Sequence, residues 1–245
     1  MASYAGRSRL PSSRRLGRQQ NRIEQCFAPF YGQFKAIIKP SLGNHELDDA
    51  NARRVAPYYY EYFGAAATGN GRDGYYSYLE EAWLVVVLNS EIPADTRQIQ
   101  FLRDQLTLHP DRFVVLVWHR PRWGSSRNGD WPPSQTFLDE VHRLRRRGFT
   151  LHGHEHGYER MRETAGFRSF IIGTGGGALY EFKSADIRSM SEYRHASADG
   201  RVTEFGVGRF RLTARGYSWE YWTAPETQTA AGRLKLADSG SQLLG

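Results

Sequence analysis

The sequence predicts a mixed α/β domain, and three observations carry that prediction. Short apolar segments, chief among them residues 113–118, have the length of strands that are buried on both faces. Helix-like apolar stripes separate these segments in the middle of the chain, and segments that alternate polar and apolar residues follow toward its end. Strands that first alternate with helices and then follow one another are typical of mixed α/β folds. Function in such folds lies at strand ends and in the loops after them.

The first elements lie before residue 90. Residues 23–39 have mixed helical character, which we expect to break at Pro29. Residues 40–74 look like a loop that contains a cluster of tyrosines. Residues 75–78 and 82–89 predict two strands joined by a Glu-rich turn.

Two helices are predicted in the middle of the chain. Asp95 and Ser134 are placed to cap their amino termini, and Gln98 would complete a capping box with Asp95. The apolar residues at helical spacing are Ile99, Leu102 and Leu106 in the first helix and Phe137, Leu138, Val141 and Leu144 in the second.

The later segments predict strands to near the end of the chain. Residues 149–151 and 167–172 read as short strands, and residues 208–214 and 217–223 as a hairpin around Gly216. We therefore predict a folded domain over residues 23–223. Residues 224–245 are predicted to be a loose C-terminal tail.

Composition excludes several classes of protein. A length of 245 residues suits one domain with a tail, and 40% hydrophobic residues argue against wholesale disorder. Cys26 is the only cysteine, so the chain has neither an internal disulfide nor a multi-cysteine metal site. No apolar run approaches the roughly 20 residues of a membrane helix, and we expect no membrane partner.

The net charge of +7 belongs almost entirely to the first 22 residues. They contain six arginines and no acid, which leaves a net charge of +1 on the other 223 residues. We predict that residues 1–22 are a disordered basic tail, and they lack the apolar stretch of a secretory signal peptide. A solvated tail, a non-native start and a nucleic-acid-binding arm all suit this composition. Because the rest of the chain is nearly neutral, we do not expect nucleic acid to be the main partner.

Histidines follow the predicted strands. His152, His154 and His156 lie within five residues directly after one strand, and His119 follows another. His45 lies in a third connection, next to Asn44. Because neutral imidazole is the commonest metal ligand near pH 7, the three closely spaced histidines predict a metal site.

The segments that carry these histidines resemble motifs of a known family. Gly43-Asn44-His45-Glu46, Val117-Trp118-His119 and Gly153-His154-Glu155-His156 resemble the third, fourth and fifth motifs of the calcineurin-like metallophosphoesterases. The resemblance covers about residues 27–223 and implies an α/β/β/α sandwich with mixed sheets. Segments similar to the purple-acid-phosphatase-like branch are residues 60–65, 88–90, 156–160 and 173–176.

The resemblance implies a metal-dependent phosphoesterase that hydrolyses phosphate esters of small substrates with metal-activated water. Carried over residue by residue, it implies that Asn44, His119 and His154 bind one ion and that His156 binds a second. It makes His45 the candidate catalytic acid. The implied cofactors are one or two ions of Fe, Zn or Mn. Arg120 and Arg127, in the loop after His119, are candidate substrate-binding residues.

The sequence departs from the family at its beginning. The first two motifs of the family each supply an aspartate, whereas this chain has no aspartate before Asp48. The resemblance therefore implies a sandwich that is incomplete at its amino-terminal side and a weakened dinuclear site. Three functions stay open: an active phosphoesterase, an inactive remnant or phospho-ligand-binding protein, and a nucleic-acid-binding protein that uses its basic arm.

Overall fold

A computed structural model describes four ranges of the chain, which are residues 23–47, 56–68, 72–225 and 234–245. The tail predicted for residues 1–22 lies outside them. Within the described ranges, no helix has both the length and the apolar character needed to span a membrane.

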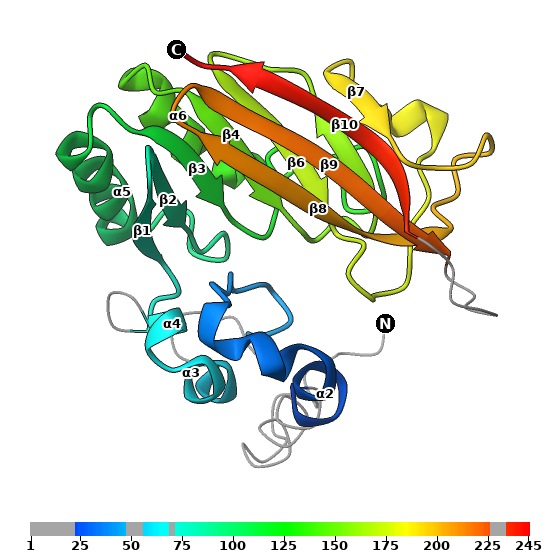
Figure 1. Ribbon diagram of the computed structural model, residues 1–245, viewed down its shortest axis with the longest axis horizontal. Helices are drawn as coiled ribbons and strands as arrows, with labels where there is room; N and C mark the ends of the chain where they lie inside the picture. Colours follow the sequence, from blue (N-terminus) through cyan, green and yellow to red (C-terminus); the bar gives the residue numbers. More distant parts are fainter. Residues whose placement is uncertain (1–22, 48–55, 69–71, 226–233) are drawn as a thin grey trace, which may run out of the picture.

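The larger of two sheets has seven strands in the order β1-β2-β3-β4-β6-β5-β7 (Figure 1). Strands β2, β3, β4 and β6 run parallel, β1 pairs antiparallel with β2, and β5 pairs antiparallel with both β6 and β7. The strands predicted around residues 75–89, 113–118, 149–151 and 167–172 are all present. The bounds are β1 Tyr76–Glu80, β2 Trp83–Val87, β3 Phe113–Val117, β4 Gly148–His152, β5 Tyr158–Met161, β6 Phe167–Ile172 and β7 Ser191–Arg194.

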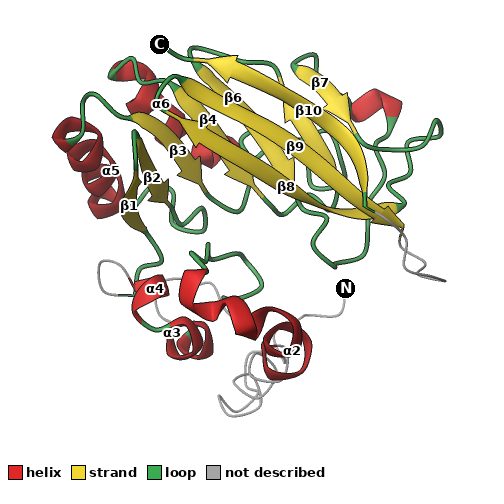
Figure 2. Cartoon of the chain, viewed as in Figure 1, coloured by secondary structure: helices red, strands yellow, loops and turns green. Residues whose placement is uncertain are grey.

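The smaller sheet has the order β10-β9-β8 and lies against one face of the larger sheet (Figure 2). The predicted hairpin is present and longer than expected, with β8 over Glu204–Thr213 and β9 over Gly216–Pro225. The expectation of a loose tail after residue 223 is wrong for Lys235–Leu243, which form β10 and pair antiparallel with β9. Its register places Gly240 opposite Trp219, where a Cβ would meet the indole ring at 2.4 Å.

Two helices cover the other face of the larger sheet, namely α5 over Thr96–Leu108 and α6 over Gln135–Arg143. Their amino termini only partly follow the predicted capping chemistry. Asp95 caps α5 by accepting from the Arg97 amide, but Gln98 turns inward and bonds to Asn89. Ser134 precedes α6 without a capping bond, since its hydroxyl donates to the Trp131 and Arg120 carbonyls.

Alternating residues of the central strands pack into two separate hydrophobic cores. On β2, Leu84 and Val86 pack toward the helices, while Trp83 and Val85 pack toward the smaller sheet. All five residues of β2 are buried, because the strand is covered on both faces. The described residues thus form a helix layer and two sheet layers, and the prediction of a mixed α/β metallophosphoesterase sandwich is confirmed in its class.

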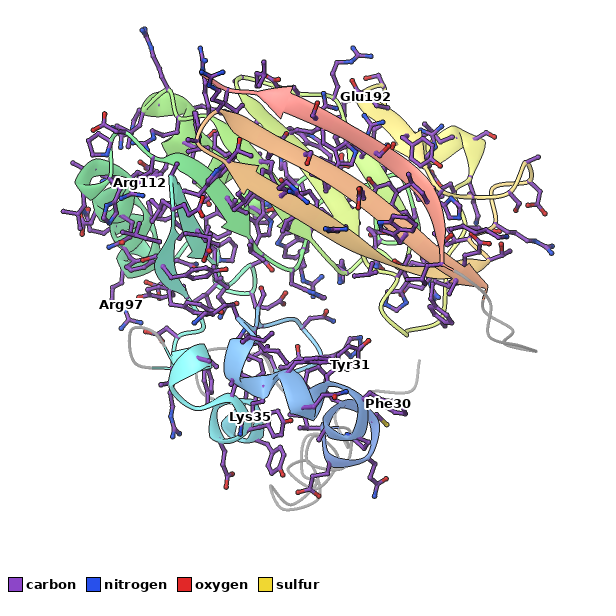
Figure 3. All side chains as sticks on the ribbon, viewed as in Figure 1. Phe30, Tyr31, Lys35, Arg97, Arg112 and Glu192 are labelled. Atoms are coloured by element: carbon purple, nitrogen blue, oxygen red, sulfur yellow. The ribbon has the colours of Figure 1, made fainter. Side chains whose placement is uncertain are left out.

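Short helical segments group together beside the sheets (Figure 1). Residues 40–74 were expected to be a loop, but α3 (Pro57–Phe63) and α4 (Ala65–Thr68) lie within them. Pro29 does not break the earlier segment; it occupies the first turn of α2, where a missing N–H costs nothing. Phe30 and Tyr31 on this segment are exposed (Figure 3). The remaining short helices are η2 Ile23–Phe27, α2 Ala28–Tyr31, η3 Gly32–Ile37, η4 Pro132–Ser134 and η5 Ser184–Asp186.

The parallel strands bring their carboxyl ends to one edge of the larger sheet. Hydrogen bonds continue the ladder past the strands, because the Trp118 amide donates to the Leu151 carbonyl and the Gly153 amide donates to the His119 carbonyl. The two histidine-bearing connections after β3 and β4 are thereby fixed side by side.

Candidate metal and substrate site

Three side chains from distant parts of the sequence converge at this edge. The Nε2 atom of His119 lies 2.7 Å from Asn44 Oδ1 and 3.2 Å from Nδ1 of His154. Two nitrogen ligands of a tetrahedral zinc ion stand about 3.3 Å apart, because each bond is about 2.0–2.1 Å long. The His119–His154 distance is close to that spacing, and Asn44 Oδ1 lies on the same His119 nitrogen. The structure brings together the three residues that the resemblance assigned to one metal.

Two glycines, Gly43 and Gly153, lie close against the His119 ring. A Cβ on Gly43 would lie 2.9 Å from Nδ1 of His119, and a Cβ on Gly153 would lie 3.3 Å from the same atom. Both glycines belong to the histidine-bearing motifs, so their role here is close approach to the ring. His154 itself has φ +66, a left-handed conformation that non-glycine residues rarely adopt and that is found at functional sites.

The two ligand imidazoles are held neutral. Burial, with contributions from His154 and Arg120, lowers the pKa of His119 to about 3. Burial and then Arg120 lower the pKa of His154 to about 4. Both rings therefore carry no proton charge near pH 7, which leaves a nitrogen lone pair on each for a metal ion.

Arg120 lies against the same site. Its Nη1 atom is 3.4 Å from Nε2 of His154, its Nε donates to Glu91 at 2.6 Å, and its guanidinium sits 4.6 Å from the Trp131 ring centre. The Ser90 hydroxyl accepts from the Arg120 amide. This cation is thus anchored by the connection after β2. Sequence reasoning missed Glu91 and Trp131, and the only signal for Glu91 was its position at a strand end.

His45 extends from the loop that carries Asn44, and its side chain is exposed. It directly follows Asn44 in the sequence, so its backbone lies beside the three converging side chains. An exposed imidazole beside the three converging side chains can reach a bound substrate.

His156 stands apart from the three converging side chains. Its Nδ1 donates to the Ala178 carbonyl at 2.5 Å, and its ring stacks on Tyr180 with the centroids 4.2 Å apart. The donated bond leaves Nε2 as the available nitrogen, in the manner of metal-binding histidines. Tyr180 was not anticipated from the sequence, in which it lies 24 residues away with no motif of its own.

His152 is the third of the closely spaced histidines, and the ligand set implied by the resemblance leaves it out. It is the last residue of β4 and is buried, with its ring against Trp118 and its nitrogens bonded to Thr150 Oγ1 and the Trp118 carbonyl. Burial lowers its pKa to about 3. A neutral imidazole fully satisfied by protein partners is a core residue.

Glu155 ties the histidine turn to the neighbouring loop. The carboxylate is buried and accepts from the Ser126 hydroxyl and the Asn128 amide, while the Asn128 side chain donates to the His154 carbonyl. Burial raises the pKa of the Glu155 carboxyl. Arg127 lies between these two anchors, and its guanidinium is 5.4 Å from the Tyr180 ring centre.

The donor set fits one ion better than two. Asn44, His119 and His154 match in number the three protein ligands that open catalytic zinc sites use. For a second ion, the candidate ligand among the described residues is His156 alone. In the part of the chain that the structure describes, no group of three or more His, Cys, Asp or Glu side chains is gathered as for a metal ion.

In the described residues, Asn44 from an early loop meets His119 and His154 at the carboxyl ends of two parallel strands. A family model described as calcineurin-like phosphoesterase matches residues 13–158. The chain belongs to the calcineurin-like phosphoesterase family, whose members are metal-dependent phosphoesterases with dimetal centres.

Three solved structures of low sequence identity align with this chain, and the first of them shows the same fold. PhoD aligns with a TM-score of 0.57 and 13% identity over 82% of this chain and 52% of its own. GAP50, the anchor in the inner membrane complex of Plasmodium, aligns with a TM-score of 0.45 and 12% identity over 67% of this chain and 54% of its own. A dimetal phosphatase from Danio rerio aligns with a TM-score of 0.36 and 13% identity over 62% of this chain and 38% of its own. The chain thus spans about half or less of these proteins, and no curated protein matches it.

Proposed function

We propose that this protein hydrolyses phosphate monoesters of small molecules, in the manner of an acid phosphatase, with one metal ion at the site. The observation that carries the proposal is the convergence of Asn44 Oδ1 and His154 Nδ1 on His119 Nε2, at 2.7 and 3.2 Å. Membership of the calcineurin-like phosphoesterase family supports the reaction class.

The ion held by these three residues would polarise a phosphoryl oxygen and lower the pKa of water. Among borderline metals, Zn, Fe and Mn all suit imidazole with an oxygen ligand. We derive no step through a second ion, because His156 has no companion ligand among the described residues.

The surrounding side chains would bind and protonate the substrate. Arg120 offers a guanidinium that Glu91 fixes in direction, and a fixed fork suits the equatorial oxygens of a phosphoryl group. His45 is exposed beside the site, where a protonated imidazole can donate to the leaving oxygen. His119 and His154 stay neutral near pH 7, so proton donation falls to His45.

A second candidate function is binding of a phosphorylated ligand without turnover. Its support is the charge at the site, where the cation Arg120 contacts His154 and no aspartate precedes Asp48 in the sequence. The third possibility, a nucleic-acid-binding arm, concerns residues 1–22 and lies outside the described residues.

The decisive assay is hydrolysis of p-nitrophenyl phosphate by purified protein supplied with Zn²⁺ or Mn²⁺. We expect turnover that EDTA removes and that His119→Ala and His154→Ala abolish. Phosphate binding without turnover in the metal-supplied protein would favour the second candidate and overturn the first.

A further inference from the structure

A cavity of about 680 Å³ opens at Tyr180, whose ring stacks on His156. This volume is in the range of pockets that hold small organic ligands. Neither the family resemblance nor the proposed chemistry assigns it a role. Its lining consists of Arg127, Leu179, Tyr180, Glu181, Lys183, Asp186, Arg201, Val202 and Thr203.

Tyr180 connects this cavity to the histidine turn. Its amide donates to the His156 carbonyl at 3.0 Å, and its ring lies parallel to the His156 ring within 14°. On the other side, the Asn128 side chain, next to Arg127 of the lining, donates to the His154 carbonyl at 3.1 Å. A substrate whose phosphate reached the proposed ion would therefore have the Tyr180 cavity next to it.

Arg127 is held in position by its neighbours in the fold, but no carboxylate among the described residues neutralises its charge. Its neighbours Ser126 and Asn128 are both bonded to Glu155, which fixes the backbone on each side of it. Its guanidinium is held over the Tyr180 ring at 5.4 Å, and no carboxylate pairs with it among the described residues.

The other cations of the lining are already paired. Lys183 lies 3.5 Å from Glu181, and Arg201 lies 3.4 Å from Asp199. Arg127 is therefore the cation of this cavity that remains available to an incoming anion.

We propose that this cavity, here called the Tyr180 pocket, binds the organic part of the substrate and selects substrates that carry a second anionic group. The inference rests on the proposed function. The phosphate lies at Asn44, His119 and His154, the organic body packs against Tyr180, Leu179 and Val202, and the second anion pairs with Arg127. Arg127 and Tyr180 are then the residues that determine specificity.

The chemistry of the lining favours this class of substrate. Leu179, Tyr180 and Val202 offer apolar surface to a carbon skeleton. A guanidinium accepts a carboxylate or a second phosphate through two parallel hydrogen bonds.

Binding of phosphonates, which are not hydrolysed, tests the proposal without relying on turnover. The probes are methylphosphonate, phenylphosphonate and 4-carboxyphenylphosphonate, titrated calorimetrically into the full chain in the presence of Zn²⁺. We expect affinity to rise in that order, with the carboxylate adding about ten-fold, as one charge-assisted contact does. Arg127→Gln should remove the gain from the carboxylate and leave phenylphosphonate binding within about two-fold.

Tyr180→Ala should lower the affinity for both phenyl probes and leave methylphosphonate unchanged. Arg215→Gln makes the same change of charge in an exposed turn outside the pocket, and should alter none of the three affinities. Two results would show that the Tyr180 pocket is not a second-anion subsite. In one, methylphosphonate and phenylphosphonate bind, but the carboxylate of the third probe adds no affinity. In the other, the affinity that the carboxylate adds is the same in Arg127→Gln. If none of the three phosphonates binds, the proposed function fails, and the inference fails with it.

Discussion

The Nδ1 atom of His154 lies 3.2 Å from Nε2 of His119, although the two residues are 35 positions apart in the sequence. The contact exists because β3 and β4 are parallel neighbours, and each histidine follows the carboxyl end of its strand. Asn44 closes the set at 2.7 Å from His119, from a loop that precedes the whole sheet. One ion can be bound by all three.

The first prediction concerns metal affinity. We expect Asn44→Ala, His119→Ala and His154→Ala each to weaken Zn²⁺ binding by at least about 100-fold, since each removes a direct ligand and even outer partners are worth 10–100-fold. Competition with a chromophoric chelator measures the affinity. His109→Ala, which removes a histidine outside the site, should bind Zn²⁺ as the wild type does. Equal affinities for all four variants would contradict the assignment.

The second prediction concerns the close approach of Gly43 to His119. A methyl group at Gly43 would lie 2.9 Å from Nδ1 and 3.0 Å from Cε1 of His119, so Gly43→Ala must displace the ring. We expect a loss of about 1–3 kcal/mol in the free energy of unfolding and weaker Zn²⁺ binding. Urea denaturation measures the first effect.

Gly175→Ala is the matched control, because a Cβ at Gly175 meets no atom within 4 Å and its φ is not in the left-handed range. It should leave stability and Zn²⁺ affinity unchanged. If Gly43→Ala matches Gly175→Ala in stability and in Zn²⁺ affinity, Gly43 is not in close contact with His119.

The third prediction concerns stability below neutral pH. Burial lowers the folded-state pKa of His152 to about 3, whereas a histidine in the unfolded chain titrates near 6.5. As pH falls below 6.5, the unfolded state takes up the proton first, so stability is full above 6.5 and is lost progressively toward pH 3. One such group contributes a slope of up to about 1.4 kcal/mol per pH unit.

Urea denaturation of EDTA-treated protein between pH 7.5 and 5 measures this slope. His119 and His154 contribute to it in the same direction, because their pKa values are also lowered. His152→Gln should be less stable at pH 7.5 but should lose stability less steeply on acidification. An unchanged slope in this variant would mean that His152 is not buried in the neutral form.

The fourth prediction concerns the anchoring of Arg127. Without the Glu155 carboxylate, the Ser126 hydroxyl and the Asn128 amide lose their acceptor, and the loop should open more often. We expect Glu155→Ala to speed tryptic cleavage after Arg127 by at least about ten-fold, consistent with a lost buried hydrogen-bond acceptor. Mass spectrometry of the first fragments measures the rate.

Glu155→Gln keeps an acceptor oxygen and should show a smaller acceleration. Cleavage after the exposed Arg215 provides the internal control and should proceed at one rate in all three proteins. If Glu155→Ala does not change the rate of cleavage after Arg127, Glu155 does not anchor this loop.

The sequence predicted the central strands because their cause is local. Strand β2 and strand β3 are nearly continuous apolar runs, as burial on both faces requires. By contrast, β10 contains Asp238 and Gly240, which are poor strand residues, and nothing local predicts it. Both positions are explained by neighbours: Asp238 accepts bonds from Tyr158, Arg160 and Trp219, and Gly240 leaves room for the Trp219 ring.

Helix α3 was missed for a related reason. Apart from Pro57, its only residue that is not aromatic is Glu61, and one charged residue is too few to reveal a helical period. Tyr59 packs edge-on against Phe63 one turn later, with the ring centroids 5.1 Å apart. Aromatic packing of this kind becomes visible only once the segment is folded against its neighbours.

For the candidate site, motif recognition found the residues that converge but not their supports. Asn44, His119 and His154 meet as the resemblance implied. The two long-range pairings that frame them, Glu91 with Arg120 and Tyr180 with His156, join residues that are 29 and 24 positions apart. The spacing of the three histidines alone does not separate His152 from His154, because the separation comes from the end of the strand at His152 and the turn of the chain at His154.

The measurement that tests the central claim most directly is the metal content of the purified full chain after loading with excess Zn²⁺ and removal of loosely held ions. The three-ligand set predicts one tightly bound Zn²⁺ per chain, lost in His154→Ala and retained in His156→Ala. Two tightly bound ions per chain, or one ion that His156→Ala removes and His154→Ala does not, would contradict the account.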